Sequence, residues 1–199
     1  MDLKFDGRIF RVSRPETELD VFVKDFVAML EKAGVKYVIV SGYVAILFGR
    51  SRNSEDVDIL IECVEFKRFE RFWAEASKRF ECINSPEPKD AFDNYLSSGL
   101  ALRFSTKGHP VPNMEVKFAK TEIDAWTISN AVDVSLNGRS LKTSPLELQI
   151  PYKLYLGSFK DIEDAKHLWL VSKDNLCAPI LNRFISELGQ EKNASKWLK

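Results

Sequence analysis

Two aspartates lie two positions apart in the apolar run Asp56-Val-Asp-Ile-Leu-Ile61. Successive side chains of a strand point to opposite faces, so Asp56 and Asp58 share one face while Val57 and Ile59 pack on the other. Adjacent carboxylates repel each other unless a cation lies between them, and oxygen ligands beside a phosphate favour Mg²⁺ or Mn²⁺. The pair therefore predicts a metal site. The alternative is a solvated edge strand, where an Asp-x-Asp pair has no ligand to bind.

A Ser-Gly pair precedes these aspartates at the end of another strand-like run. Ser41 and Gly42 follow residues 37–40, a run rich in β-branched side chains, and come just before a short apolar helix expected at 43–48. Backbone N–H groups and a hydroxyl at the start of a helix suit a phosphate, and glycine lets the backbone approach the ligand closely. The pair predicts a phosphate-binding turn. The same two residues could also serve only to start the helix.

A mixed α/β core is expected to position these residues, with a helical part after it. Thr17 and Gly34 mark the two ends of a strongly amphipathic helix. Strands are expected at 36–41, 56–61, 99–105 and 113–118, a strand or hairpin at 3–12, a hairpin turning at 137–138, and further helices at 64–80 and 121–130. The resulting fold class is α/β (α+β), a mixed sheet flanked by helices.

The helical part begins near residue 144. Ser144 is expected to cap it, with Pro145 in the first turn and Glu147 reaching back to the cap. Breaks are expected near Gly157 and Pro179. A boundary at about residue 143 then separates a core of residues 1–143 from a helical region, 144–199, that packs on it.

The run from Ser41-Gly42 through Phe48-Gly-Arg-Ser-Arg-Asn-Ser-Glu-Asp-Val-Asp58 resembles the nucleotidyltransferase superfamily, and is closest to its minimal and AbiEii-toxin-like branch. The match covers residues 37–62. A second block, Tyr152-Lys-Leu-Tyr-Leu-Gly-Ser-Phe-Lys-Asp-Ile-Glu-Asp164, is similar to the family's later Lys and Lys-Asp-x-x-Asp motifs. The resemblance implies a nucleotidyltransferase-type mixed sheet and a nucleoside triphosphate (NTP) substrate.

The resemblance also implies roles for other residues. Family members add a third carboxylate from a later strand, and Glu115 is the best candidate because Met114, Val116 and Phe118 alternate away from it. Residues implied to bind the nucleotide or its phosphates are Ser41, Gly42, Arg50, Arg52, Lys153, Lys160 and Asp161.

Each of these assignments has a simpler alternative. Glu115 could face water on an exposed sheet surface. Lys153 could be a surface lysine whose stem lies along apolar atoms, and Lys160 and Asp161 could be ordinary charges at the start of a helix after Ser158.

Composition limits the function classes. The 29 basic and 29 acidic residues cancel, which argues against a general nucleic-acid coat protein. Three cysteines without a CxxC pair indicate reduced thiols rather than a disulfide framework or a zinc site. With no apolar signal core at the N-terminus and no run long enough to span a membrane, the protein is expected in the cytoplasm, without a membrane partner.

The resulting functional prediction is a metal-dependent nucleotidyltransferase with Mg²⁺ or Mn²⁺ as cofactor. It would transfer a nucleoside monophosphate from an NTP to a hydroxyl of a protein, a tRNA end or a small molecule, and release pyrophosphate. The alternative is a catalytically weak nucleotide-binding or partner-binding module of the same fold. A toxin–antitoxin setting would add a cognate antitoxin as partner. The nucleotide base, the acceptor and the oligomeric state are left open by the sequence.

Overall fold

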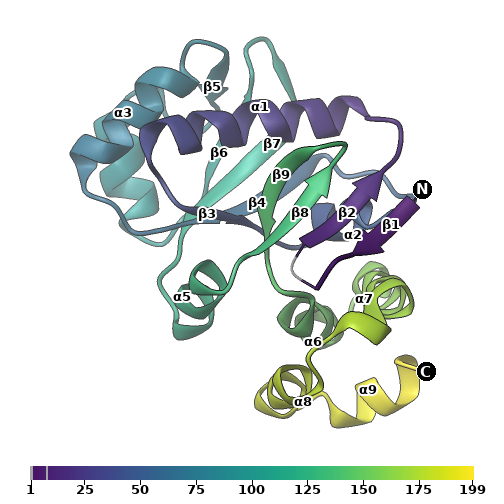
Figure 1. The fold of residues 1–199 in the computed structure, drawn as a ribbon. Coiled ribbons are helices and arrows are strands. Elements are labelled where there is room, and N and C mark those ends of the chain that lie inside the picture. The colour runs from purple at the N-terminus through teal and green to yellow at the C-terminus, as the bar shows by residue number, and fades with distance from the viewer. Residues whose placement is uncertain (1, 8) are drawn as a thin grey trace. The chain divides into compact units, whose positions relative to one another are not determined.

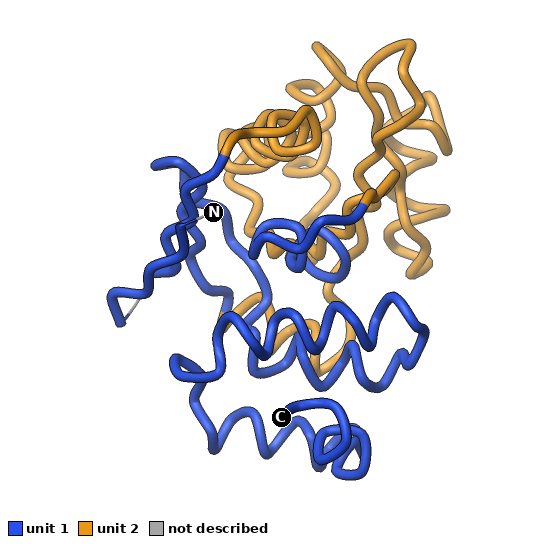
Figure 2. Tube along the Cα trace, turned by 90° about the vertical axis from the view of Figure 1, so that its right-hand side faces the viewer, with its two compact units in different colours: residues 1–14, 40–52, 131–199 blue, residues 15–39, 53–130 orange. Residues whose placement is uncertain are grey.

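The computed structural model describes residues 2–7 and 9–199, and the chain divides into two compact units (Figure 2). Unit 1 contains residues 1–14, 40–52 and 131–199, and unit 2 contains residues 15–39 and 53–130. Each unit combines strands with helices (Figure 1), which confirms the predicted mixed α/β class. No helix in the described part of the chain is long and apolar enough to cross a membrane.

Unit 1 is built on four strands in the order β1-β2-β8-β9. The outer pairs β1/β2 and β8/β9 are antiparallel, and β2/β8 is parallel. The bounds of these strands are β1 (Asp2–Phe5), β2 (Ile9–Ser13), β8 (Val132–Leu136) and β9 (Arg139–Thr143). A two-residue turn joins β8 to β9, and both of its residues, Asn137 (φ 50°) and Gly138 (φ 89°), adopt the positive φ that this tight hairpin requires.

The helices of unit 1 include the short α2, which carries the Ser-Gly turn, and the predicted C-terminal helical region. Helix α6 packs against α7 and α8, and α2 packs against α7. Their bounds are α2 (Gly42–Leu47), α6 (Leu146–Leu156), α7 (Phe159–Ser172), the 3₁₀ turn η2 (Lys173–Asn175), α8 (Ala178–Glu187) and α9 (Glu191–Trp197). The predicted breaks near Gly157 and Pro179 are confirmed. Helix α6 ends at Leu156, just before Gly157, and α8 begins at Ala178, just before Pro179.

Unit 2 is built on five strands in the order β3-β4-β7-β6-β5. Only β4/β7 is a parallel pair among them. The bounds are β3 (Tyr37–Ile39), β4 (Asp56–Ile61), β5 (Phe80–Cys82), β6 (Leu102–Thr106) and β7 (His109–Phe118). Strand β4 has the predicted limits, whereas β7 extends four residues further toward the N-terminus than expected.

Aromatic side chains fill the core of unit 2 between its sheet and its long helices. The Phe26 ring lies 5.7 Å from Phe72, 5.2 Å from Phe80 and 5.5 Å from Phe104, and all four are buried. The helices of this unit are α1 (Glu18–Ala33), α3 (Phe66–Ala76), α4 (Pro88–Asp90), the π-helical turn η1 (Ala91–Leu96) and α5 (Glu122–Ser129). Burial of these rings fixes α1 and α3 on one face of the sheet.

Three local predictions are wrong. The helix expected to reach residue 80 ends at Ala76, because Phe80 is buried as a strand residue paired with Thr106. Residues 88–96 form α4 and η1, for which the sequence predicted no element. Ser144 does not cap α6: its hydroxyl donates to the Pro145 carbonyl and to Gln149, and the helix begins without a side-chain cap.

Two further predictions concern the domain boundary near residue 143 and the N-terminal hairpin. The boundary near residue 143 stays a prediction, since the contact units group the helical residues 144–199 with segments 1–14, 40–52 and 131–143. The hairpin predicted at 3–12 is present as β1 and β2, with residue 8 lying outside the described residues.

The N-terminal cap of α1 provides a test of the local structure of unit 2. The Thr17 hydroxyl accepts a hydrogen bond from the Asp20 N–H at 3.2 Å, and the Asp20 carboxylate accepts one from the Thr17 N–H at 2.7 Å. We expect Thr17→Ala to lower the free energy of unfolding by about 1 kcal/mol in chemical denaturation. Thr17→Ser, which keeps the hydroxyl, should leave it nearly unchanged; equal losses in both variants would show that the cap contributes nothing.

Candidate functional site

A row of polar side chains crosses one face of the unit 2 sheet. In β4 the residues Val57, Ile59 and Ile61 are buried, while Asp56 is exposed and Asp58 is half-buried, so the two aspartates share the face opposite the aromatic core. The β4/β7 register places Asp58 directly beside Glu115, and the β6/β7 register places Glu115 beside Arg103. Paired strands lie about 5 Å apart, so these three side chains are direct neighbours.

Glu115 is engaged by two cations of its own sheet. Its carboxylate lies 2.6 Å from Lys117 Nζ and 3.2 Å from Arg103 Nη2. Burial on its own raises the pKa of Glu115, but the Lys117 and Arg103 pairs outweigh it and hold that pKa below its ordinary value. A carboxylate with a lowered pKa is a weak base, so the geometry does not favour Glu115 for taking a proton.

The donor chemistry of this face fits a hard cation. Asp56 and Asp58 supply carboxylate oxygens from positions i and i+2 of one strand, and such oxygens suit Mg²⁺ or Mn²⁺. Within residues 2–7 and 9–199, no three His, Cys, Asp or Glu side chains are gathered as a metal-binding set. Asp56 and Asp58 are therefore the candidate ligands. Glu115 could join them only by exchanging its pairs with Lys117 and Arg103.

The two aspartates of β4 lie within an apolar run, yet neither carboxylate is deeply buried. In the structure Asp56 is exposed, with Ser54 Oγ donating to it at 3.3 Å, and Asp58 is only half-buried. The cost of burying the carboxylates is thus small, and the case for a cation rests on their proximity instead.

In unit 1, the Ser41-Gly42 turn adopts an unusual backbone conformation. Ser41 has φ 61° and ψ −134°, a region that glycine occupies freely and other residues rarely enter. Such a conformation costs on the order of 1–3 kcal/mol. The Ser41 side chain forms no cap hydrogen bond to α2, so it does not play the simple helix-starting role.

A buried glutamine of α6 offsets this strain. Gln149 Nε2 donates to the Ser41 carbonyl oxygen at 3.0 Å, and the Ser41 N–H donates to Gln149 Oε1 at 3.4 Å. The Ser144 hydroxyl donates to the same Oε1 at 3.2 Å, and Gln149 is only 3% exposed. Hydrogen bonds of this kind contribute about 1 kcal/mol each, which is comparable to the strain.

Gly42 is in close contact with the guanidinium group of Arg52. A Cβ atom added at Gly42 would lie 2.7 Å from Arg52 Nη2 and 3.2 Å from its Cζ. Real Cβ atoms essentially never lie so close to a neighbour, so a side chain at position 42 would push the guanidinium group away from the turn. The predicted turn and one of the predicted phosphate-binding arginines therefore meet within unit 1.

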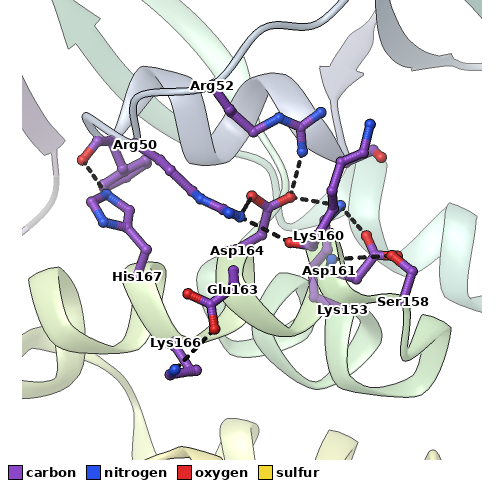
Figure 3. Close-up of polar contacts among 12 residues, drawn as sticks. Arg50, Arg52, Lys153, Ser158, Lys160, Asp161, Glu163, Asp164, Lys166 and His167 are labelled. Atoms are coloured by element: carbon purple, nitrogen blue, oxygen red, sulfur yellow. Dashed lines mark hydrogen bonds and ion pairs between the residues drawn. The ribbon is translucent and has the colours of Figure 1, made fainter.

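Arg50 and Arg52 both pair with the carboxylate of Asp164 in α7. Figure 3 shows the two guanidinium groups pointing toward it, and Arg52 Nη1 lies 2.7 Å from Asp164 Oδ2. Arg50 also donates to the Lys160 carbonyl oxygen at 2.8 Å. The Asp164 side chain is fully buried, while the arginine side chains are 19% and 15% exposed and thus keep access to solvent.

Lys153 joins the same cluster from α6. Its Nζ lies 2.6 Å from Asp161 and 3.1 Å from Asp164, and at 2% exposed it is not a surface lysine. Burial on its own raises the pKa of Asp161, but the Lys153 pair and the Ser158 hydroxyl outweigh it and lower that pKa overall. Three cationic side chains thus gather around two carboxylates, and guanidinium groups such as those of Arg50 and Arg52 suit phosphate oxygens.

The predicted site residues thus fall into two sets. Unit 1 brings together Ser41, Gly42, Arg50, Arg52, Lys153 and Asp161, and Lys160 takes part through its backbone carbonyl while its side chain is exposed. Unit 2 holds Asp56, Asp58 and Glu115. Sequence reasoning missed Gln149, although a lone amide within an otherwise apolar helical run is a signal of a buried hydrogen-bonding role. It also named no role for Asp164 beyond its motif.

This fold is of the nucleotidyltransferase type. Over most of its length the chain is similar to the crystal structure of an antigenic nucleotidyltransferase-like protein from Paracoccidioides brasiliensis, with a TM-score of 0.54 and 18% identity, covering 93% of this chain and 94% of that one. It is also similar to the antibiotic-resistance factor ANT(2″)-Ia in solution, with a TM-score of 0.52, 13% identity, and 88% and 94% of the two chains covered.

A further similar structure is ANT(2″)-Ia in complex with adenylyl-2″-tobramycin, with a TM-score of 0.56 and 13% identity, covering 88% of this chain and 99% of that one. No protein-family model matches the sequence, and no curated protein matches it either. The likeness establishes the fold. Assignment to the AbiEii-toxin-like branch stays a prediction.

The buried carboxylate of Asp164 gives a stability prediction for unit 1. Asp164→Asn would leave Arg50, Arg52 and Lys153 with a single carboxylate, and breaking a buried ion pair costs about 3–5 kcal/mol. We expect a loss of unfolding free energy in that range by urea denaturation. The matched control is Asp133→Asn, which breaks the more exposed Lys142 pair and should cost less than about 1 kcal/mol. Similar losses in both variants would contradict a special role for Asp164.

Proposed function

We propose that the protein transfers a nucleoside monophosphate from an NTP to a hydroxyl group of an acceptor. The acceptor oxygen forms a bond to the α-phosphorus, and the bond from that phosphorus to the α–β bridging oxygen breaks. The hydroxyl proton passes to solvent or a nearby base, and the electron pair of the broken bond leaves with pyrophosphate. Positioning and charge neutralisation supply most of the rate in such a reaction.

The observation that carries this proposal is the acidic face of β4 within a nucleotidyltransferase-type fold. The fold alone does not set a function. The side-by-side carboxylates, the guanidinium groups of Arg50 and Arg52, and the sequence resemblance over residues 37–62 all support the same chemistry.

The two units have different tasks in this proposal. Asp56 and Asp58 of unit 2 hold Mg²⁺ or Mn²⁺, which when bound would activate the acceptor hydroxyl and neutralise charge on the leaving pyrophosphate. Ser41, Gly42, Arg50 and Arg52 of unit 1 bind the triphosphate, since guanidinium forks match phosphate oxygens. Lys153, which pairs with both Asp161 and Asp164, and Asp161 hold the arginine cluster in place rather than contact the phosphates.

A protein side chain, a tRNA 3′ end and a small molecule are the three classes of acceptor to test. The similar structure with bound adenylyl-2″-tobramycin, in which an adenylyl group is joined to a small molecule, supports including the last class. A cognate antitoxin partner is also part of the proposal.

The carboxylate pair gives the direct test of this function. Wild-type protein, labelled NTPs and Mn²⁺ or Mg²⁺ should label a component of a cell extract, a tRNA pool or tobramycin, and chelation with EDTA should stop the transfer. The double variant Asp56→Asn with Asp58→Asn should lose at least about 1,000-fold in rate, because it removes both proposed metal ligands. It should also weaken Mn²⁺ binding in calorimetry.

The matched control for this test is Asp90→Asn with Asp93→Asn. It makes the same change in net charge within unit 2, on α4 and η1, and should leave metal binding and turnover unchanged. Absence of transfer by the wild type with all four NTPs and every acceptor would end the enzymatic proposal.

A second candidate function is a nucleotide-binding or partner-binding module with little turnover. The pairs of Glu115 with Lys117 and Arg103 favour it, because they occupy the third carboxylate that a catalytic metal site of this family would use. Tight binding of an NTP by the wild type without pyrophosphate release would support this reading over the enzymatic one.

Glu115→Gln separates these readings at the level of one side chain. Because two cations already hold Glu115, we expect this variant to weaken Mn²⁺ binding by less than about threefold, whereas Asp58→Asn alone weakens it by about tenfold or more. Calorimetric titration of Mn²⁺ measures both. Equal losses would make Glu115 a full third ligand and strengthen the enzymatic reading.

A further inference from the structure

Gln149 of α6 has no role in the proposed chemistry, yet it forms hydrogen bonds with both the N–H and the carbonyl group of Ser41. It accepts from the Ser41 N–H at 3.4 Å and donates to the Ser41 carbonyl oxygen at 3.0 Å. Its own orientation is fixed in turn, because the buried Ser144 hydroxyl donates to its Oε1 at 3.2 Å.

These contacts have a specific consequence for the turn. Since the Ser41 N–H is already used within the protein, the groups left to meet a phosphate at this turn are the Ser41 hydroxyl and the backbone around Gly42. The direction in which they point depends on the Ser41 conformation of φ 61° and ψ −134°. A serine returns from this conformation to an ordinary one unless something holds it.

We propose that Gln149 is a positioning residue for phosphate binding: it holds Ser41 in this conformation, so that the turn and the guanidinium group of Arg52 beside Gly42 are arranged before the nucleotide arrives. Prearrangement of this kind raises affinity by removing the cost of ordering the turn on binding. We call the two hydrogen bonds between Gln149 and the Ser41 backbone the clamp. The identity of the ligand rests on the proposed function, whereas the clamp rests on these hydrogen bonds alone.

The first test needs no ligand. In the ¹⁵N-labelled full chain, Gln149→Met keeps the volume of the side chain and removes both hydrogen bonds. The Ser41 amide should then exchange with solvent at least about tenfold faster, and the Ser41 and Gly42 signals should shift. The matched control is Gln190→Met, which removes the bond from Gln190 to the Leu188 carbonyl, elsewhere in unit 1. Unchanged Ser41 and Gly42 signals in Gln149→Met would overturn the clamp.

The second test measures affinity for ATP with Mg²⁺, and for GTP, CTP and UTP, by calorimetry. Gln149→Met should weaken binding by about tenfold or more, and Gln190→Met should not. In a Ser41→Gly background the conformation is free of strain, so the same Gln149→Met change should cost less than about threefold. An equal loss in both backgrounds would show that Gln149 stabilises the protein generally, and would overturn the positioning role.

The two tests distinguish failure of this inference from failure of the proposed function. Wild-type protein that binds none of the four NTPs would overturn both the proposed function and the phosphate role of Gln149, while the amide exchange result would still decide whether the clamp exists. Wild-type binding with no loss in Gln149→Met would leave the proposed function intact and overturn the inference.

Discussion

A buried charge is tolerated in a protein only when opposite charges and hydrogen bonds replace the water that it has lost. Asp164 is such a charge, and the replacement comes from Arg50 and Arg52 in the segment after α2 and from Lys153 in α6. The requirement ties the segment after α2 to the helices α6 and α7. It also fixes the guanidinium group that lies against Gly42, so one electrostatic constraint sets the arrangement of the residues proposed to bind phosphate.

Strand alternation plays the corresponding part in unit 2. The same six residues of β4 place Val57, Ile59 and Ile61 against the aromatic core and Asp56 and Asp58 on the opposite face. Side chains that pack in the core therefore alternate along the strand with side chains that could bind a ligand. Because the buried side of β4 secures the register with β7, apolar burial places Asp58 beside Glu115.

The sequence predicts the elements whose signals are local. The capping box and Gly34 define α1, the Asn137-Gly138 pair defines the β8/β9 hairpin, and alternation defines β4. It fails where a distant partner decides: Phe80 joins β5 because of Phe26 and Thr106, and Ser144 gives up its capping role because its hydroxyl meets Gln149. In the site, residue types pointed to Arg50, Arg52 and Lys153. Their convergence on Asp164 depends on tertiary packing, which the spacing of these residues along the sequence does not reveal.

The partner of Ser41 lies 108 residues further along the chain. A ribosome therefore releases the Ser-Gly turn long before the helix that holds it. During synthesis Ser41 therefore lacks its two hydrogen bonds to Gln149 until α6 has been made. The final geometry of the turn thus depends on chain order, since it can form only after α6 has been made and has packed against it.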